Sequence, residues 1–186
     1  MIIDYLLIFV NFLKRKNNEY PKSTNYEIFS KNNMDTELDY QEYVEGTMIN
    51  LYYDNTKGDW ELSTRSNIGG RYAFYDTTDS TFRNMFLTAF TDMQLEFEYF
   101  KPGYSYSFVL QHPENRIVVP FNKRQLILTN VYKLNGTFVE EVELNNPGTW
   151  FEPSEYDKLK FPRSLDTLID LTENKISVVY DKIISG

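Results

Sequence analysis

Two short groups of polar residues have side chains that suit the handling of phosphate. Glu45-Gly46-Thr47 combines a carboxylate, a glycine that permits close approach, and a hydroxyl. Ser63-Thr64-Arg65 combines two hydroxyls with a guanidinium, whose planar array of N–H donors matches phosphate and carboxylate oxygens. Brought together, an acid, a glycine, hydroxyls and an arginine would form an edge at which phosphate is bound.

These two groups lie at the ends of two predicted β-strands. Residues 47–53 are rich in β-formers, and residues 60–64 alternate large and polar side chains. The intervening DNTKGD tolerates positive φ angles and predicts a tight turn. Because the start of one strand lies beside the end of the next in an antiparallel pair, we expect Glu45 and Arg65 to meet. The alternative is a solvated acid and a surface salt bridge that contributes about 0–1 kcal/mol.

Other candidate residues have both a functional and a structural interpretation. Arg116, which follows Asn115, either projects toward the same edge or bonds carbonyls of its own turn. The single histidine, His112, is interpreted as structural because no second histidine or cysteine exists to share a metal with it. Lys158 and Lys160 are interpreted as a solvated surface near a Pro-Arg turn.

Composition limits the classes of function. The chain has 186 residues, which suits one domain with a core of its own. The absence of cysteine excludes disulfides, thiolate metal sites and cysteine nucleophiles. A formal net charge of −8 opposes a broad, non-specific grip on nucleic acid, which needs a basic surface. The net charge does not exclude a local basic groove, but the two residues Lys123-Arg124 are too few to identify one.

The N-terminal part begins with an apolar segment. Residues 2–13 are mainly apolar, are interrupted by Asp4 and are followed by KRK. This is well short of the roughly 20 residues needed to cross a bilayer. A signal peptide would carry its positive charge before the apolar segment. We therefore expect a helix packed on the domain, no stable membrane insertion, and an intracellular, cytoplasmic protein. Anchoring of residues 2–13 in a membrane is the alternative.

The remaining pattern predicts an α+β domain built mainly from antiparallel strands. A continuous apolar face at helical spacing predicts a core helix that contains Phe82, Met85, Phe86, Ala89, Phe90 and Met93. Further strands are predicted at 104–110, 126–134 and 137–144. Asn135-Gly136 separates the last two strands and is a strong hairpin signal.

Two passages resemble the covalent nucleotidyltransferases, most closely the phage-type RNA ligases and their relatives in large DNA viruses. They are EGTMINLYYD…WELSTRSNIGG and YSFVLQHPENRIVVPF, and the resemblance covers roughly residues 42–132. It implies part of a ligase adenylation domain, of mainly antiparallel nucleotidyltransferase type, over residues 40–186. Residues 1–39 would add a helix and a polar connection. The resemblance also implies ATP and Mg²⁺ as cofactors, a lysine–AMP intermediate, and nucleotide and RNA as partners.

The motif residues of this family carry over at five positions. Glu45-Gly46 match the acid–glycine pair of the first motif, and Thr47 follows it. Arg65 matches the arginine of the hydroxyl–arginine element, and Arg116 matches the arginine of the second passage. The resemblance therefore implies that these five residues bind the nucleotide.

The chain differs from the family pattern at the positions of the residues that carry out catalysis. Tyr43 stands at the position of the nucleophilic lysine, and its phenol is mostly protonated at neutral pH. Val109 stands at the position of a glutamate and cannot bind a metal or a ribose. The acid–glycine and Lys-x-Lys strands of the later motifs do not follow in the family's order.

These observations lead to two hypotheses. The first is an RNA-ligase-like nucleotidyltransferase domain, truncated or degenerate, with no catalytic or metal-binding residue assigned. The second is a non-catalytic domain that uses the same scaffold to bind nucleotide, nucleic acid or another partner.

Overall fold

The computed structural model describes residues 40–41, 44–72, 81–115, 120–136 and 138–165. The chain divides into two compact units, of which the sheet unit is Val44–Pro162. The other unit comprises Met1–Tyr43 and Arg163–Gly186. Its described residues form an antiparallel pair of β1 (Tyr40–Gln41) and β7 (Ser164–Leu165). The helix expected within residues 1–39 lies outside the described residues.

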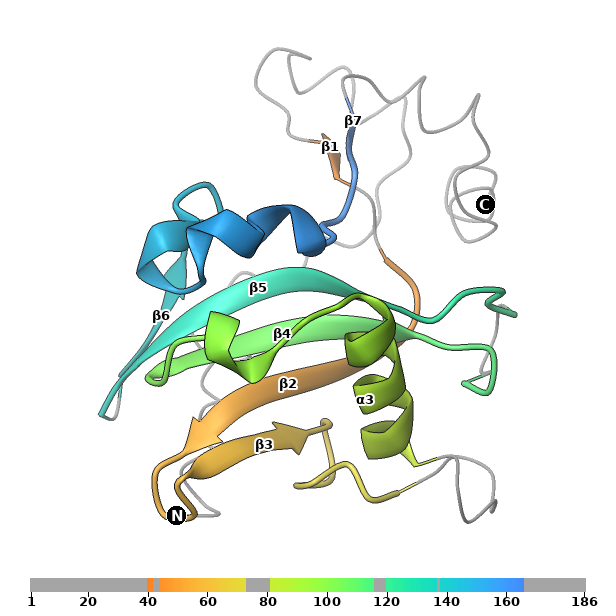
Figure 1. Ribbon diagram of the computed structural model, residues 1–186, viewed down its shortest axis with the longest axis horizontal. Coiled ribbons are helices and arrows are strands. Elements are labelled where there is room, and N and C mark those ends of the chain that lie inside the picture. Colours follow the sequence, from red (N-terminus) through yellow and green to blue (C-terminus); the bar gives the residue numbers. More distant parts are fainter. Residues whose placement is uncertain (1–39, 42–43, 73–80, 116–119, 137, 166–186) are drawn as a thin grey trace, which may run out of the picture. The chain divides into compact units, whose positions relative to one another are not determined.

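The sheet unit is built on one five-stranded antiparallel sheet with the order β3-β2-β4-β5-β6 (Figure 1). Its strands are β2 (Thr47–Asp54), β3 (Asp59–Ser63), β4 (Tyr104–Gln111), β5 (Gln125–Asn135) and β6 (Phe138–Val142). The predicted α+β class with a mainly antiparallel sheet is confirmed.

Both predicted hairpins are present. In the first, β2 and β3 pair as far as Asp54 opposite Asp59, on either side of the predicted turn. In the second, β5 and β6 pair from Asn135 opposite Phe138. Gly136 has a φ angle of 58°, which is the left-handed conformation that an Asn-Gly turn requires.

The predicted core helix is α3 (Phe82–Asp92), which lies against one face of the sheet (Figure 1). Its N-cap is Thr81, whose hydroxyl oxygen accepts a hydrogen bond from the Asn84 amide at 3.2 Å. The helix buries five of the six residues of the predicted apolar face: Phe82, Met85, Phe86, Ala89 and Phe90. The sixth, Met93, is the C-cap of the helix and is partly buried. Helical periodicity therefore identified the element and the face that it buries.

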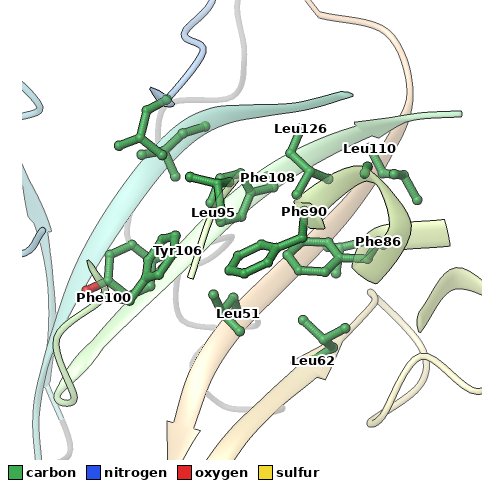
Figure 2. Close-up of a cluster of buried hydrophobic side chains, with 14 of the residues drawn as sticks. Leu51, Leu62, Phe86, Phe90, Leu95, Phe100, Tyr106, Phe108, Leu110 and Leu126 are labelled. Carbon is green, nitrogen blue, oxygen red and sulfur yellow. The ribbon is translucent and has the colours of Figure 1, made fainter. Parts of the chain in front are cut away.

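Aromatic rings fill the space between α3 and the sheet (Figure 2). The ring centroid of Phe86 lies 5.7 Å from that of Phe108 on β4, and Phe90 lies 5.7 Å from Phe100. Phe100 in turn packs edge-on against Tyr106 at 4.9 Å. Burial raises the pKa of the Tyr106 phenol, whose hydroxyl donates a hydrogen bond to the Trp150 carbonyl. These contacts make the sheet a rigid base for the residues at its ends.

The described part of the sheet unit also contains three short 3-10 helices: η2 (Phe97–Tyr99), η3 (Pro147–Thr149) and η4 (Pro153–Lys158). After η4 the chain runs parallel to the first half of β5, where Ile127 and Lys160 form an isolated bridge. The Leu128 amide donates to the Lys160 carbonyl at 2.7 Å. Lys160 is therefore attached to the sheet. Among the helices of the described residues, none is long and apolar enough to cross a membrane.

Candidate functional site

The acid–glycine step lies at the start of β2, beside the end of β4. Thr47 is opposite Leu110, and Gly46 precedes this pair with a φ angle of 149°. A Cβ atom added to Gly46 would lie 2.5 Å from the Leu110 carbonyl oxygen and 2.7 Å from Cγ1 of Val109. Contacts this short exclude a side chain. The packing of β4 is therefore sufficient to explain the glycine at this position.

Two glutamines join Glu45 to the neighbouring strands. Gln111 at the end of β4 donates from Nε2 to the Glu45 carbonyl oxygen at 2.8 Å. Gln125 is opposite Gln111 at the start of β5, and its Nε2 donates to Gln111 Oε1 at 2.5 Å. Lys160 Nζ completes the series by donating to Gln125 Oε1 at 2.9 Å. We call Gln111 and Gln125 the amide relay. In each of these three side-chain hydrogen bonds, the donor lies on the Lys160 side and the acceptor on the Glu45 side.

Thr47 is joined to the loop that follows β4. Asn115 Nδ2 donates to the Thr47 hydroxyl oxygen at 2.8 Å, and Asn115 is only 2% exposed. Among the described residues, its Oδ1 atom has no hydrogen-bond partner. Since the hydroxyl oxygen is the acceptor in this bond, the hydroxyl proton of Thr47 is not used in it and can be donated to another group. This bond links the first of the two resembling passages to the second.

His112 supports the same loop. Its ring is buried, Nδ1 accepts a hydrogen bond from the Glu114 amide at 3.2 Å, and Nε2 lies 3.3 Å from the Thr88 hydroxyl. Burial lowers the pKa of His112, so that the neutral ring is favoured. The Asn115 amide also bonds the His112 carbonyl at 2.9 Å. These contacts agree with the structural interpretation of the histidine.

Arg65 lies in an exposed turn after β3. The Thr64 hydroxyl accepts a hydrogen bond from the Asn67 amide at 3.1 Å, and Ser63 forms a bridge with Ile68. The register places Ser63, the last residue of β3, opposite Asn50 of β2. The chain therefore reverses before β3 reaches the start of β2. Contrary to our expectation, strand pairing does not bring Arg65 beside Glu45.

The structure thus joins Glu45, Gly46 and Thr47 to the end of β4 and to Asn115, and it leaves Arg65 in a separate turn. Arg116 and Tyr43 lie outside the described residues. We did not predict the amide relay from the sequence. Its signal is a pair of glutamines at the ends of two neighbouring strands, and this pair can be recognised only when the β4–β5 register is known.

The described residues do not fit a magnesium ion. Val109, which the ligase resemblance aligns with a glutamate, is 6% exposed and packs against Gly46. No group of three acidic or histidine side chains that could hold a metal ion occurs within the described ranges. Hard cations such as Mg²⁺ require oxygen ligands, which Val109 cannot supply.

A second charged cluster is centred on Glu61, in the middle of β3 and opposite Tyr52 of β2. Glu61 is buried, and its carboxylate lies 2.6 Å from Lys57 Nζ and 2.6 Å from a guanidinium nitrogen of Arg83 on α3. Burial raises the pKa of Glu61, but hydrogen bonds from Lys57, the Leu62 amide and Arg83 outweigh it and hold the pKa at about 2. The cluster ties the hairpin to the core helix.

Neither protein-family models nor curated proteins gave a significant match to this chain.

Proposed function

We propose that the sheet unit is an RNA-ligase-like nucleotidyltransferase domain that binds a nucleotide and does not adenylylate itself. The observation that supports this most strongly is the 2.8 Å hydrogen bond from Asn115 to Thr47. The two residues come from the two passages that resemble the ligases, and this bond brings the passages together at one end of the sheet. A shared site needs this proximity.

The residues at the start of β2 have the chemistry to contact a nucleotide. Glu45 is half-buried, and its carboxylate can accept hydrogen bonds from a ribose hydroxyl. The Thr47 hydroxyl can donate to a phosphate or ribose oxygen because Asn115 occupies its acceptor side. Arg65 and Arg116 would contribute guanidinium groups, Arg65 from its exposed turn.

Loss of self-adenylylation is part of the proposal. Forming a lysine–AMP bond requires an unprotonated lysine and cations that offset charge on the reacting phosphate. Tyr43 replaces that lysine in the motif, and the buried Val109 replaces a carboxylate. The described residues are therefore proposed only to bind and orient the nucleotide.

Thermal unfolding with and without ATP, combined with intact-protein mass spectrometry, tests the proposal. At about ten times its Kd, a nucleotide adds about 1.4 kcal/mol to the free energy of unfolding, which raises Tm by a few degrees. We expect this rise, and no gain of an AMP mass after incubation with ATP and Mg²⁺. The control is the Thr47→Val variant, in which the rise should be smaller.

Two outcomes would contradict the proposal. A mass gain of one AMP would show that the domain adenylylates itself through a different nucleophile. An unchanged Tm at millimolar ATP would remove nucleotide binding and favour an interaction domain on the same scaffold. RNA, the other partner that the resemblance implies, is tested by titration with a 5′-phosphorylated oligonucleotide.

A further inference from the structure

We propose that this chain binds a second copy of itself, with the loop after β3 of one copy seated on the β5–β6 hairpin of the other. The inference does not depend on nucleotide binding. The loop comprises residues 64–72, and three of its exposed side chains are those of Ile68, Arg71 and Tyr72. We call these three residues the loop patch.

Backbone hydrogen bonds hold the loop between β3 and α3. The Gly69 amide donates to the Leu62 carbonyl at 2.6 Å, and the Gly70 carbonyl accepts from the Arg83 amide at 2.9 Å. The side chain of Arg71 lies over Gly69, where an added Cβ atom would be 3.7 Å from Arg71 Cγ and Nε. A loop held in this way loses little conformational freedom when a partner binds, which favours association.

The loop patch is apolar and positively charged. Ile68 is 41% exposed and Tyr72 is 60% exposed, although both are large hydrophobic residues. Arg71 is exposed and forms no ion pair with a carboxylate within the described ranges. Arg65 adds a second positive charge to the same loop. Tyrosine and arginine are enriched among the residues that dominate the affinity of protein interfaces, so the patch suits an acidic protein surface.

A surface of the opposite charge lies on the β5–β6 hairpin. β6 and the residue after it carry three exposed carboxylates, those of Glu140, Glu141 and Glu143. The register places one exposed cation, Lys133, opposite Glu140. Phe138 at the start of β6 is 63% exposed. We call Phe138, Glu140 and Glu143 the hairpin patch, whose carboxylates and aromatic ring complement the loop patch in charge and in apolar character.

The two patches lie at opposite edges of the sheet. β3 and β6 are the edge strands, and β2, β4 and β5 lie between them (Figure 1). Because neighbouring strands are about 4.8 Å apart, the two edges are separated by about 19 Å. The patches of one copy therefore meet only those of another copy, in a head-to-tail interface. A symmetric pairing of β6 with β6 would bring glutamates against glutamates, which is unfavourable.

A strand of nucleic acid is another partner that arginine and an exposed tyrosine could bind. The loop has only two cations, Arg65 and Arg71, in a chain of net charge −8, which opposes binding of a polyanion. Ile68 offers an aliphatic contact and no ring on which a base could stack. These observations favour a protein surface, and the hairpin patch is one that this chain itself supplies.

Sedimentation velocity of the full chain at increasing concentration tests the inference. Arg71→Glu reverses the charge of the loop patch, and Lys123→Glu makes the same change at an exposed lysine outside it. We expect the wild type to associate reversibly and Arg71→Glu to weaken the association about tenfold or more. Lys123→Glu should change it less than about twofold. Tyr72→Ser, which keeps the charge, should weaken it about threefold or more.

A mixture of two variants tests the head-to-tail arrangement. Glu140→Lys combined with Glu143→Lys reverses two charges and keeps Glu141, whose carboxylate accepts a hydrogen bond from Asn130 at 2.7 Å. This double variant and Arg71→Glu should each associate weakly alone. Mixed in equal amounts, they should form a heterodimer, because the unchanged loop of one meets the unchanged hairpin of the other. A mixture that stays monomeric would overturn the inference.

Three further outcomes would overturn it. The first is a wild type that stays monomeric at every concentration. The second is an equal effect of Arg71→Glu and Lys123→Glu, which would leave only the net charge as the cause. The third is a monomeric wild type that binds a single-stranded oligonucleotide through Arg71, which would assign the loop to nucleic acid. The Tm of each variant verifies folding, and Arg71→Gln replaces Arg71→Glu if that variant does not fold.

Discussion

The two ends of the β2–β3 hairpin are held by different kinds of contact. At the turn end, the Asp54 carboxylate accepts hydrogen bonds from the amides of Thr56 at 2.9 Å and Lys57 at 3.4 Å. These partners are two and three residues away in sequence. At the open end, Glu45 and Thr47 are held by Gln111 and Asn115, which are 66 and 68 residues away.

The two ends therefore depend on contacts of different range along the sequence. Turn chemistry acts within a few residues, so the turn end forms wherever the hairpin forms. The open end exists only when β4 pairs with β2 in one register, because a one-residue slip would turn Gln111 to the other face. The candidate site therefore depends on tertiary structure more than the turn does.

The largest expected effect is at Gly46, where the open end meets β4. Gly46→Ala places a Cβ atom 2.5 Å from the Leu110 carbonyl oxygen at a φ angle of 149°. Strain and overpacking together should lower the free energy of unfolding by about 3–5 kcal/mol. Urea unfolding measures this loss.

The control for Gly46 is Gly136 in the β5–β6 turn. Gly136 also has a positive φ angle, but no atom of the described residues beyond its chain neighbours lies within 4 Å of the position of its Cβ. Gly136→Ala should lower the free energy of unfolding by only about 1–2 kcal/mol, from backbone strain. Equal losses in the two variants would mean that contact with β4 does not explain Gly46.

The next effect is at the charged cluster centred on Glu61. Glu61→Gln removes the charge that binds Lys57 and Arg83 in a side chain that is 8% exposed. We expect a loss of about 1.5–3 kcal/mol in the free energy of unfolding, as for hydrogen bonds to a charged group. Nucleotide affinity should not change, because the contacts of Glu61 are with Lys57, Arg83 and the Leu62 amide, which are not among the proposed nucleotide-binding residues. A loss of affinity equal to that of Thr47→Val would contradict this independence of the cluster from the proposed site.

The same cluster predicts a dependence of stability on pH. The pKa of Glu61 is about 2 in the folded protein, below its ordinary value of 4.5. The unfolded chain therefore takes up the proton first, and the contribution of Glu61, complete above pH 4.5, is lost as the pH falls toward 2. Tm measured over this pH range should fall more steeply for the wild type than for Glu61→Gln. Parallel curves would mean that Glu61 is not the group responsible.

A smaller loss of stability is expected at Thr47. Thr47→Val removes the hydroxyl that accepts the Asn115 hydrogen bond and should cost about 1–2 kcal/mol in the free energy of unfolding. Unlike Glu61→Gln, it should also reduce nucleotide affinity. Stability is measured by urea unfolding and affinity by calorimetry. A variant with wild-type affinity would limit Thr47 to a structural role.

The smallest effect on stability is expected at Arg65. Its side chain is exposed in the turn after β3, so Arg65→Ser should change the free energy of unfolding by no more than about 0.5 kcal/mol. If Arg65 binds phosphate, ATP affinity should fall although stability does not. An unchanged affinity would remove Arg65 from the nucleotide-binding residues.

Much of the fold was predictable because its signals are local. The helical spacing of apolar residues from Phe82 to Phe90 identified α3 and its buried face. Asn135-Gly136 identified one hairpin, and the polar turn after Asp54 identified the other. These patterns depend on residues that are close together in the sequence. They can therefore be recognised without knowledge of the tertiary structure.

The candidate site was predictable only in part. The residue types at Glu45, Gly46 and Thr47 indicated where a polar edge would begin, but not which residues surround it. The sequence also led us to place Arg65 beside Glu45. The strand pairing on which that prediction relied does not extend so far, because β3 ends opposite Asn50.

The sequence by itself determined the secondary structure of the two hairpins and of α3, because turn chemistry and hydrophobic periodicity act over short distances. Tertiary structure alone decided that Gly46 is required by β4, that Gln111 and Gln125 form a relay, and that the loop after β3 lies at the opposite edge of the sheet from β6. Each of these facts depends on the pairing of segments far apart in the chain. That pairing follows from burial of the whole core, which no single segment encodes.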